Sequence, residues 1–289
     1  IKLDCTTADT SIAAGEYFVL AYHMEGQDLQ QLKKGTSDAE TVTLSFYVKG
    51  NASATYTCEF RDVENTRYIS QEFSVTTSWN RISLTFDGDT VGALSDDTTG
   101  RMYLYFWLHA GSTYAGGTHT SNAWHTTEAN RVSDSQTSIV DSTDREFFIT
   151  GLQMEVGSVA TPFEHRSFGE ELALCERYFV ECFSGDSNYE SAGSGWAYGS
   201  NAGVAVYRTL RVQMRARPTL AKSASGTIHV SDDVNSSINV SNMITNTNVT
   251  SRQFMYMECT ASGAATYRPY HIRANGTTTD ASLTLDAEL

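Results

Sequence analysis

The residues of this sequence best suited to a binding chemistry are aromatic side chains placed near hydroxyl and amide groups. Aromatic faces cover the apolar C–H surfaces of a sugar ring, while Asn, Asp or Gln side chains bond its hydroxyls. Tyr103, Tyr105 and Trp107 alternate along one expected strand and would share one of its faces. The residues that we assign to a glycan-binding surface are Trp107, Tyr114, Asn122, Trp124, His125, Tyr189, Trp196 and Tyr198.

Packing is the competing explanation for these aromatic residues. The strand that carries Tyr103 and Tyr105 can be buried on both faces, against its partner sheet and against a second copy of the chain, and we favour that interface for both residues. For Trp124, on a polar loop, binding and packing are equally open. Trp196 and Tyr198 fall in a Gly/Ser-rich segment, residues 184–203, which we expect to be a loop where packing is at least as good an explanation.

An acidic segment offers a possible metal site. Asp87, Asp89, Asp96 and Asp97 fall on one expected loop, and clustered carboxylates supply the hard oxygen ligands that Ca²⁺ prefers. The EF-hand spacing is absent, so a solvated loop is the favoured alternative. A structural Ca²⁺ is the one cofactor that the sequence brings into consideration.

The motifs of common hydrolases are absent from the sequence. It contains no Gly-x-Ser-x-Gly elbow, no His-Glu-x-x-His motif and no phosphate-binding Gly loop. His119 and His125 lie six residues apart, which is not a metal-ligand spacing. The five cysteines are scattered without a Cys-x-x-Cys pair, which predicts buried free thiols from a reducing compartment. We therefore expect no enzymatic activity.

Charge and composition narrow the class of partner. The 289 residues include 20 Lys and Arg against 34 Asp and Glu, a net charge of −14. This balance argues against nucleic acid or an anionic membrane surface as the main partner. The longest apolar run, residues 102–108, is far too short to span a bilayer. The chain begins with Ile1 rather than Met, which favours a processed or incomplete start.

The elements that must position these residues are strands. Thr and Ser number 36 and 31, Pro only three, and apolar residues alternate from Thr41 to Lys49 and from Met102 to His109. Several such segments at roughly ten-residue spacing, separated by polar loops, predict a jelly-roll sandwich. The strands expected in the second half of the chain lie near residues 204–214, 228–230, 238–240, 254–259, 267–273 and 283–289.

One helix interrupts the β pattern. Ser167 and Glu170 have the spacing of a capping box, and Leu172, Cys175 and Phe179 follow at helical spacing. We expect an all-β protein of two antiparallel β-sandwiches joined by this helix. The N-terminal jelly roll would span residues 1–166, the helix 167–180 and a smaller sandwich of about seven strands 181–289. The hinge between them would be built by Pro162, Phe163, Ser167 and Glu170.

The stretch from residue 148 to 178 carries a recognisable signature. It contains FITGLQMEVGS, ATPFEHRS and EELALCERY in this order. It resembles the TGxQLEVGxxATPFEHRSxGEELALCxRY signature of tail-fibre and other virion structural proteins of tailed phages, particularly marine ones. Residues 42–50 and 77–81 are similar to the carbohydrate-binding-module-like jelly roll of that family, and residues 214–219 and 286–289 to its C-terminal domain.

The resemblance implies a virion protein, made in the cytoplasm of the host bacterium and assembled with other virion proteins. Trimerisation is usual in this family, so a homo-oligomer is expected. The implied function is a tail fibre or appendage that recognises a glycan of the host surface. A head-decoration protein with a purely structural role is the first alternative. A capsule depolymerase is the second, although no β-helix repeat supports it.

Overall fold

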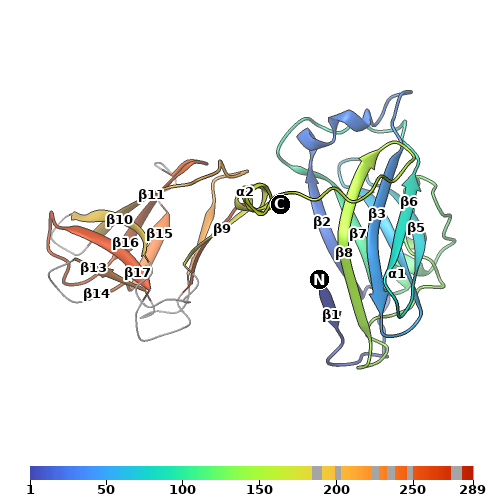
Figure 1. Cartoon of the computed structure of the whole chain (residues 1–289), viewed down its shortest axis with the longest axis horizontal. Coiled ribbons are helices and arrows are strands. Elements are labelled where there is room, and N and C mark those ends of the chain that lie inside the picture. Colours follow the sequence, from blue (N-terminus) through green and yellow to red (C-terminus); the bar gives the residue numbers. More distant parts are fainter. Residues whose placement is uncertain are drawn as a thin grey trace. The chain divides into compact units, whose positions relative to one another are not determined.

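The computed structural model describes residues 1–183, 191–198, 203–222, 228–232, 238–245, 250–274 and 282–288. The chain divides into two compact units, unit 1 from Ile1 to His165 and unit 2 from Arg166 to Glu288 (Figure 1). This division lies one residue from the boundary expected at residue 166. Both units are built almost entirely from antiparallel strands, so the prediction of an all-β sandwich fold is confirmed.

Unit 1 is a sandwich of two four-stranded sheets. Their strand orders are β1-β8-β3-β6, called sheet A, and β2-β7-β4-β5, called sheet B, and every neighbouring pair is antiparallel. The strands are β1 (Lys2–Asp4), β2 (Tyr17–Glu25), β3 (Val42–Gly50), β4 (Ala54–Asp62), β5 (Arg67–Val75), β6 (Asn80–Phe86), β7 (Gly100–Ala110) and β8 (Glu146–Val156). The short helices are η1 (Gly26–Asp28), η2 (Gln30–Leu32), α1 (Ser112–Ala115) and η3 (Glu128–Asn130).

Alternation along the strands explains how the core of unit 1 forms. The even-numbered positions of β3 from Val42 to Val48 point inward, as their period-two spacing predicts. The Phe46 ring meets the rings of Phe73 and Phe106 edge-on, with centroids 5.2 and 5.0 Å apart. Such edge-to-face contacts add to the stabilisation from apolar burial. In each strand the residues that alternate with these inward positions are thereby left to the outward faces of the two sheets.

A long connection between β7 and β8, residues 111–144, lies against the outward face of sheet B, and we call it the strap. Its backbone pairs with β5, because the amides of Tyr68 and His125 bond each other's carbonyl oxygens at 2.9 Å. The amide of Asn122 also donates to the carbonyl of Ser70. The strap was expected to be a loop, and it holds only α1 and η3 as regular structure.

Unit 2 pairs a seven-stranded sheet, of order β14-β13-β17-β10-β11-β16-β15, with a three-stranded sheet, β12-β18-β9. Its core is formed by apolar residues that include Val206, Met255 and Met257. The described part of unit 2 has ten strands where about seven were expected. They are β9 (Phe179–Phe183), β10 (Ser191–Tyr198), β11 (Gly203–Thr209), β12 (Thr219–Lys222), β13 (Ile228–Ser231), β14 (Ile238–Asn239), β15 (Asn242–Thr245), β16 (Phe254–Thr260), β17 (Pro269–Ala274) and β18 (Leu283–Asp286).

The helix α2 (Phe168–Glu176) begins with the predicted capping box. The Ser167 hydroxyl accepts from the amide of Glu170, and the Glu170 carboxylate accepts from the amide of Ser167 at 3.0 Å. The helix ends before the expected residue 180, because Phe179 already begins β9. Among the described residues, no helix is long and apolar enough to cross a membrane.

The expected hinge has an exposed Pro162 and a half-buried Phe163, whose ring lies edge-on to that of His165 at 4.9 Å. All five cysteines are free thiols. Four are buried, as predicted, whereas Cys175 is exposed on α2. The buried assignment of Cys175 is therefore wrong.

Candidate functional site

The strap brings a charged side chain onto the aromatic stripe of β7. Arg131 and Glu59 are 2 % and 0 % exposed and form a bidentate ion pair, with Nε–Oε1 and Nη2–Oε2 distances of 2.8 and 2.9 Å. The indole Nε1–H of Trp107 donates to the same Glu59 carboxylate at 2.9 Å. The paired charges satisfy each other inside the protein, as a buried ion pair must.

Four aromatic rings surround the Arg131 guanidinium. Its central carbon lies 4.4 Å from the ring centre of Tyr68, 4.8 Å from Trp107, 5.5 Å from Tyr114 and 5.9 Å from Tyr105. Trp107 is only 1 % exposed, so its indole is inaccessible to a sugar in solution. Its assignment to the glycan-binding surface is wrong, because the strap covers the aromatic stripe and places the Arg131 guanidinium against the Trp107 ring. Tyr114 is half-buried in the same cluster.

The other end of the stripe is partly open. The ring of Tyr103 stacks on that of His23, with centroids 3.7 Å apart and an interplanar angle of 17°. Tyr103 and Tyr105 are both half-buried. The interface between chain copies that we expected for these two residues stays a prediction.

The remaining strap residues assigned to sugar binding make contacts that anchor the strap. The indole of Trp124 donates to the carbonyl of Asp87 at 2.8 Å and packs against the core. The Asn122 amide oxygen accepts from the Asp87 amide at 3.1 Å. His125 is half-buried beside Tyr68. Of the two roles left open for Trp124, these contacts provide packing.

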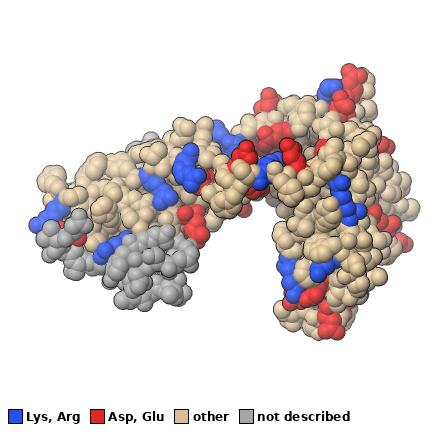
Figure 2. All heavy atoms as spheres, viewed as in Figure 1, with Lys and Arg blue, Asp and Glu red and all other residues tan. Residues whose placement is uncertain are grey.

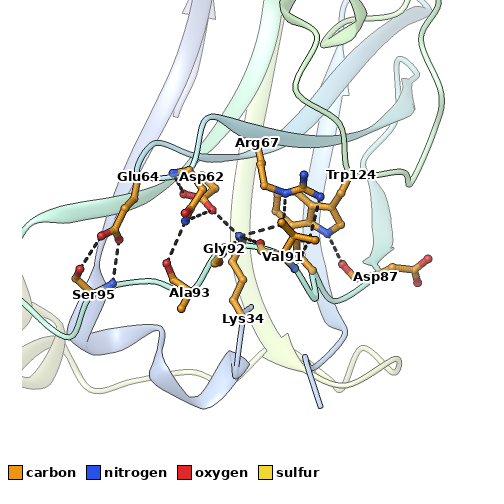
Figure 3. Close-up of polar contacts among 12 residues, drawn as sticks. Lys34, Asp62, Glu64, Arg67, Asp87, Val91, Gly92, Ala93, Ser95 and Trp124 are labelled. Atoms are coloured by element: carbon orange, nitrogen blue, oxygen red, sulfur yellow. Dashed lines mark hydrogen bonds and ion pairs between the residues drawn. The ribbon is translucent and has the colours of Figure 1, made fainter. Parts of the chain in front are cut away.

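A buried cation lies next to Trp124. The Lys34 ammonium is surrounded by four oxygen atoms at hydrogen-bond distance (Figure 3): Asp62 Oδ2 at 2.5 Å, Asp89 Oδ2 at 3.0 Å, and the carbonyls of Val91 at 2.9 Å and Gly92 at 2.8 Å. We call this arrangement the lysine cage. Arg67 also donates to both oxygens of Asp89, at 2.6 and 3.0 Å. Burial raises the pKa of Asp89, but the hydrogen bonds from Arg67 and Lys34 outweigh it and lower that pKa.

The four aspartates assigned to calcium binding do not converge. Asp89 belongs to the lysine cage, Asp97 pairs with Arg101, and Asp87 and Asp96 are exposed. Within the described residues, no three His, Cys, Asp or Glu side chains gather in a group that could hold a metal ion. The four side chains therefore do not form one cluster, because basic side chains neutralise two of them, and binding of a structural Ca²⁺ stays a prediction.

A cavity beside the lysine cage is too small for a sugar. It is lined by Lys34, Phe60, Phe86, Met102 and Trp124 among others, and leaves about 20 Å³ for the centre of a water-sized molecule. That space suits a water molecule rather than a pyranose ring. This cavity therefore cannot hold a sugar ring, whereas an outer surface of the protein could.

Unit 2 presents an aromatic surface of that kind. Trp196 stacks on Tyr207, with centroids 4.9 Å apart and an interplanar angle of 27°, and Trp196 is 47 % exposed. Tyr207 also contacts Tyr256 at 4.9 Å and Phe254 at 5.5 Å. We call the set Trp196, Tyr198, Tyr207, Phe254 and Tyr256 the aromatic platform.

The platform lies on the face of the seven-stranded sheet opposite the core. Trp196 and Tyr198 alternate along β10 with Ala197, which is 1 % exposed and faces inward. The prediction that Trp196 and Tyr198 lie on a loop is wrong, since small residues hide the strand period of β10. Tyr189 lies outside the described residues.

Polar groups flank the platform. The hydroxyl of Ser194 lies 2.9 Å from Nδ1 of His271 on the neighbouring strand. Burial raises the pKa of Tyr198, and the nearby Glu258 carboxylate raises it further. Burial likewise raises the pKa of Tyr256 to about 12, so both phenols stay protonated as donors at neutral pH. Aromatic faces with polar groups beside them are the elements of a saccharide surface.

One serine–histidine contact in unit 1 has the distance of a nucleophile–base pair. Ser70 Oγ lies 3.0 Å from Nε2 of His119, with Glu72 nearby. The Ser70 side chain is fully buried, and its hydroxyl donates to the carbonyl of Arg131 at 2.8 Å. That hydroxyl cannot reach a substrate, so the contact holds the strap and offers no nucleophile.

No family model and no curated protein matches this chain. One similar solved structure, described as "CBM4 structure and function", shares 13 % identity at a TM-score of 0.25, over 48 % of this chain and 59 % of its own. This chain thus spans less than two thirds of that structure's length.

A second structure is the N-terminal CBM22-1-CBM22-2 tandem domain from Paenibacillus barcinonensis Xyn10C. It shares 13 % identity over 99 % of this chain and 97 % of its own, with a TM-score of 0.24. At TM-scores this low, neither structure indicates the function of this chain.

Proposed function

We propose that this chain is a non-enzymatic structural protein of a phage virion that binds a host-surface glycan through the aromatic platform of unit 2. The observation that carries the proposal is the exposed Trp196 ring, stacked on Tyr207 and continued by Tyr256. An exposed ring that is already packed against a second ring loses little conformational entropy when a sugar stacks on it. The signature at residues 148–178 supports the virion part of the proposal.

Surface charge is compatible with such a partner. On the face that Figure 2 shows, basic side chains occur in small separate groups. A neutral or weakly charged saccharide meets little repulsion at the platform, where the Glu258 carboxylate interacts with Tyr198. Nucleic acid would need a continuous basic surface.

The proposal is tested by glycan-array and host-envelope binding of the full chain. We expect Trp196→Ala to weaken binding by about tenfold, as loss of one aromatic stacking contact and its buried area would do. Phe168→Ala is the matched control, because Phe168 is 83 % exposed on α2, away from the platform in sequence. Equal binding by the two variants would contradict the platform as the site.

A head-decoration protein is the second candidate. The open platform favours it too, because a sheet face rich in rings can pack against another protein. That role predicts that the folded, fully assembled oligomer has no affinity for glycans. Light scattering would measure its oligomeric state, which we expect to be a trimer. Release of reducing ends from a host polysaccharide would instead establish the depolymerase alternative.

A further inference from the structure

The outward face of sheet A carries a row of alternating basic and aromatic residues. Lys2 of β1 and Lys49 of β3 both lie opposite Phe148 of β8. The pairing of Val48 with Asn80 places Trp79 beside Lys49 on the far side. The row therefore runs Lys2, Phe148, Lys49, Trp79, from β1 across β8 and β3 to the residue that precedes β6, over about 14 Å at the usual strand spacing. We call it the sheet A row.

The side chains of this row touch. The Lys49 ammonium lies 4.6 Å from the ring centre of Phe148 and 5.5 Å from that of Trp79, so it sits between the two rings. The Lys2 ammonium lies 5.6 Å from the Phe148 ring. Trp79 is 47 % exposed. A partly exposed indole thus lies next to an ammonium group.

The charge of Lys49 has no acidic partner among the residues that the structure describes. Lys2 pairs with Glu146 at 2.6 Å, Lys33 with Glu40 at 2.5 Å, and Lys34 with Asp62 and Asp89. In the described part of the chain, Lys49 has no carboxylate within ion-pair distance. This is notable in a protein with 34 acidic residues. An anion could therefore pair with Lys49 without displacing any acidic side chain of the described residues.

We propose that the sheet A row binds an acidic sugar of a polysaccharide, such as a uronic acid. The apolar face of the sugar ring would stack on Trp79, and its carboxylate would pair with Lys49. An ammonium 5.5 Å from the indole centre is within reach of a carboxylate on a ring stacked over that indole. A row of about 14 Å suits an oligosaccharide better than a single sugar.

This inference rests on the proposed function only in taking glycan as the class of ligand. The sheet A row is in unit 1 and the aromatic platform in unit 2, so either site can fail alone. A purely structural role for the row, in which the lysine stems cover the rings, predicts no preference for acidic sugars. The preference is therefore the property to measure.

The test uses the full chain and three oligosaccharides, of galacturonate, glucuronate and mannuronate, each compared with its methyl ester by calorimetry. We expect at least one acid to bind about fivefold more tightly than its ester, the upper range for an exposed ion pair. Lys49→Met should abolish that preference while keeping the contacts with both rings. The preference should also shrink as salt is added.

The controls separate the two sites. Lys33→Met removes one positive charge from an exposed pair elsewhere in unit 1 and should keep the acid preference. Trp79→Ala should weaken binding of the acid, whereas Trp196→Ala should leave the acid preference intact. Circular dichroism confirms that each variant folds. The proposal is overturned if no acid is preferred over its ester, or if Lys49→Met retains the preference.

Discussion

The ammonium nitrogen of Lys34 lies 3.0 Å from Oδ2 of Asp89, and both side chains are 3 % exposed. The same nitrogen contacts Asp62 at 2.5 Å and two backbone carbonyls. Lys34, which follows η2, thereby connects this part of the chain to Asp62 of β4 and to the segment after β6. The lysine cage thereby fixes the acidic loop that was expected to be a solvated or metal-binding segment.

Removal of the cage cation should destabilise unit 1 strongly. Lys34→Met leaves the Asp62 carboxylate buried without its cation, and breaking a buried pair in this way costs about 3–5 kcal/mol. Thermal or urea unfolding followed by tryptophan fluorescence measures the loss. Lys33→Met, which breaks an exposed pair with Glu40, should cost less than about 1 kcal/mol. Similar losses in the two variants would contradict the role of the cage.

Calcium should partly replace the missing lysine. Lys34→Ala leaves two carboxylates and two carbonyls around an emptied position, which are the hard oxygen ligands that Ca²⁺ prefers. Addition of Ca²⁺ should raise the melting temperature of this variant and leave that of the wild type unchanged, with stabilisation of about 2.7 kcal/mol at 100 times the dissociation constant. A chelator should reverse the effect. If Ca²⁺ does not change the melting temperature of the variant, the four oxygen atoms do not lie close enough together to bind the ion.

The strap should depend on its own ion pair. Arg131→Met leaves Glu59 buried and uncompensated, so we expect a loss of about 3 kcal/mol or more. Adding Glu59→Gln to that variant should recover part of the loss, and a double-mutant cycle should give a coupling of about 0.5–3 kcal/mol. Glu128→Gln, at the exposed partner 3.5 Å from Arg131, is the control and should be nearly neutral. Additive effects at Glu59 and Arg131 would contradict the pairing.

Two strap histidines should make unit 1 sensitive to mild acid. Burial lowers the pKa of His119 below the ordinary value of 6.5 although Glu72 opposes it, and burial and His119 lower that of His125. The unfolded chain then binds protons more readily than the folded one, so stability falls as pH drops below about 6.5. Buried carboxylates with lowered pKa values, such as Asp89, add their losses only at more acidic pH, around and below 3.8.

The measurement is the melting temperature between pH 7.5 and pH 5. The double variant His119→Gln, His125→Gln should show a flatter profile than the wild type over this range. Histidine proton resonances followed by NMR would give the two pKa values directly. Profiles that coincide would mean that other groups govern the acid response.

Sequence alternation predicted much of unit 1, because residues such as Phe46 and Phe106 repeat every second position and face one core. The alternation could not show that Trp107 is buried, because Arg131 covers the outward face of its strand. The ion pair that holds Arg131 there joins it to Glu59, which is 72 residues away in the sequence. The sequence predicted Trp196 as a candidate but not its strand, because Gly and Ala in β10 hide the alternation of apolar and polar residues. The platform partners Tyr207 and Tyr256 follow only from strand register.

The sheet A row was missed for the same reason. Lys49 and Trp79 are 30 residues apart, and Phe148 is a further 69 residues along the chain. Each is an ordinary strand residue when taken singly. Their juxtaposition depends on β1, β8, β3 and β6 pairing in one register, which no local pattern encodes.

The placement of Arg131 has a consequence for the rate at which unit 1 opens. The strap can dock only after β4, β5 and β7 have paired, because the surface that Arg131 enters does not exist before then. Interactions that form after the folding transition state slow unfolding and leave the folding rate almost unchanged. Arg131→Met should therefore shorten the lifetime of the native state much more than it slows refolding, as a chevron plot would show. The strap would then prolong the lifetime of the folded state without changing the rate at which that state forms.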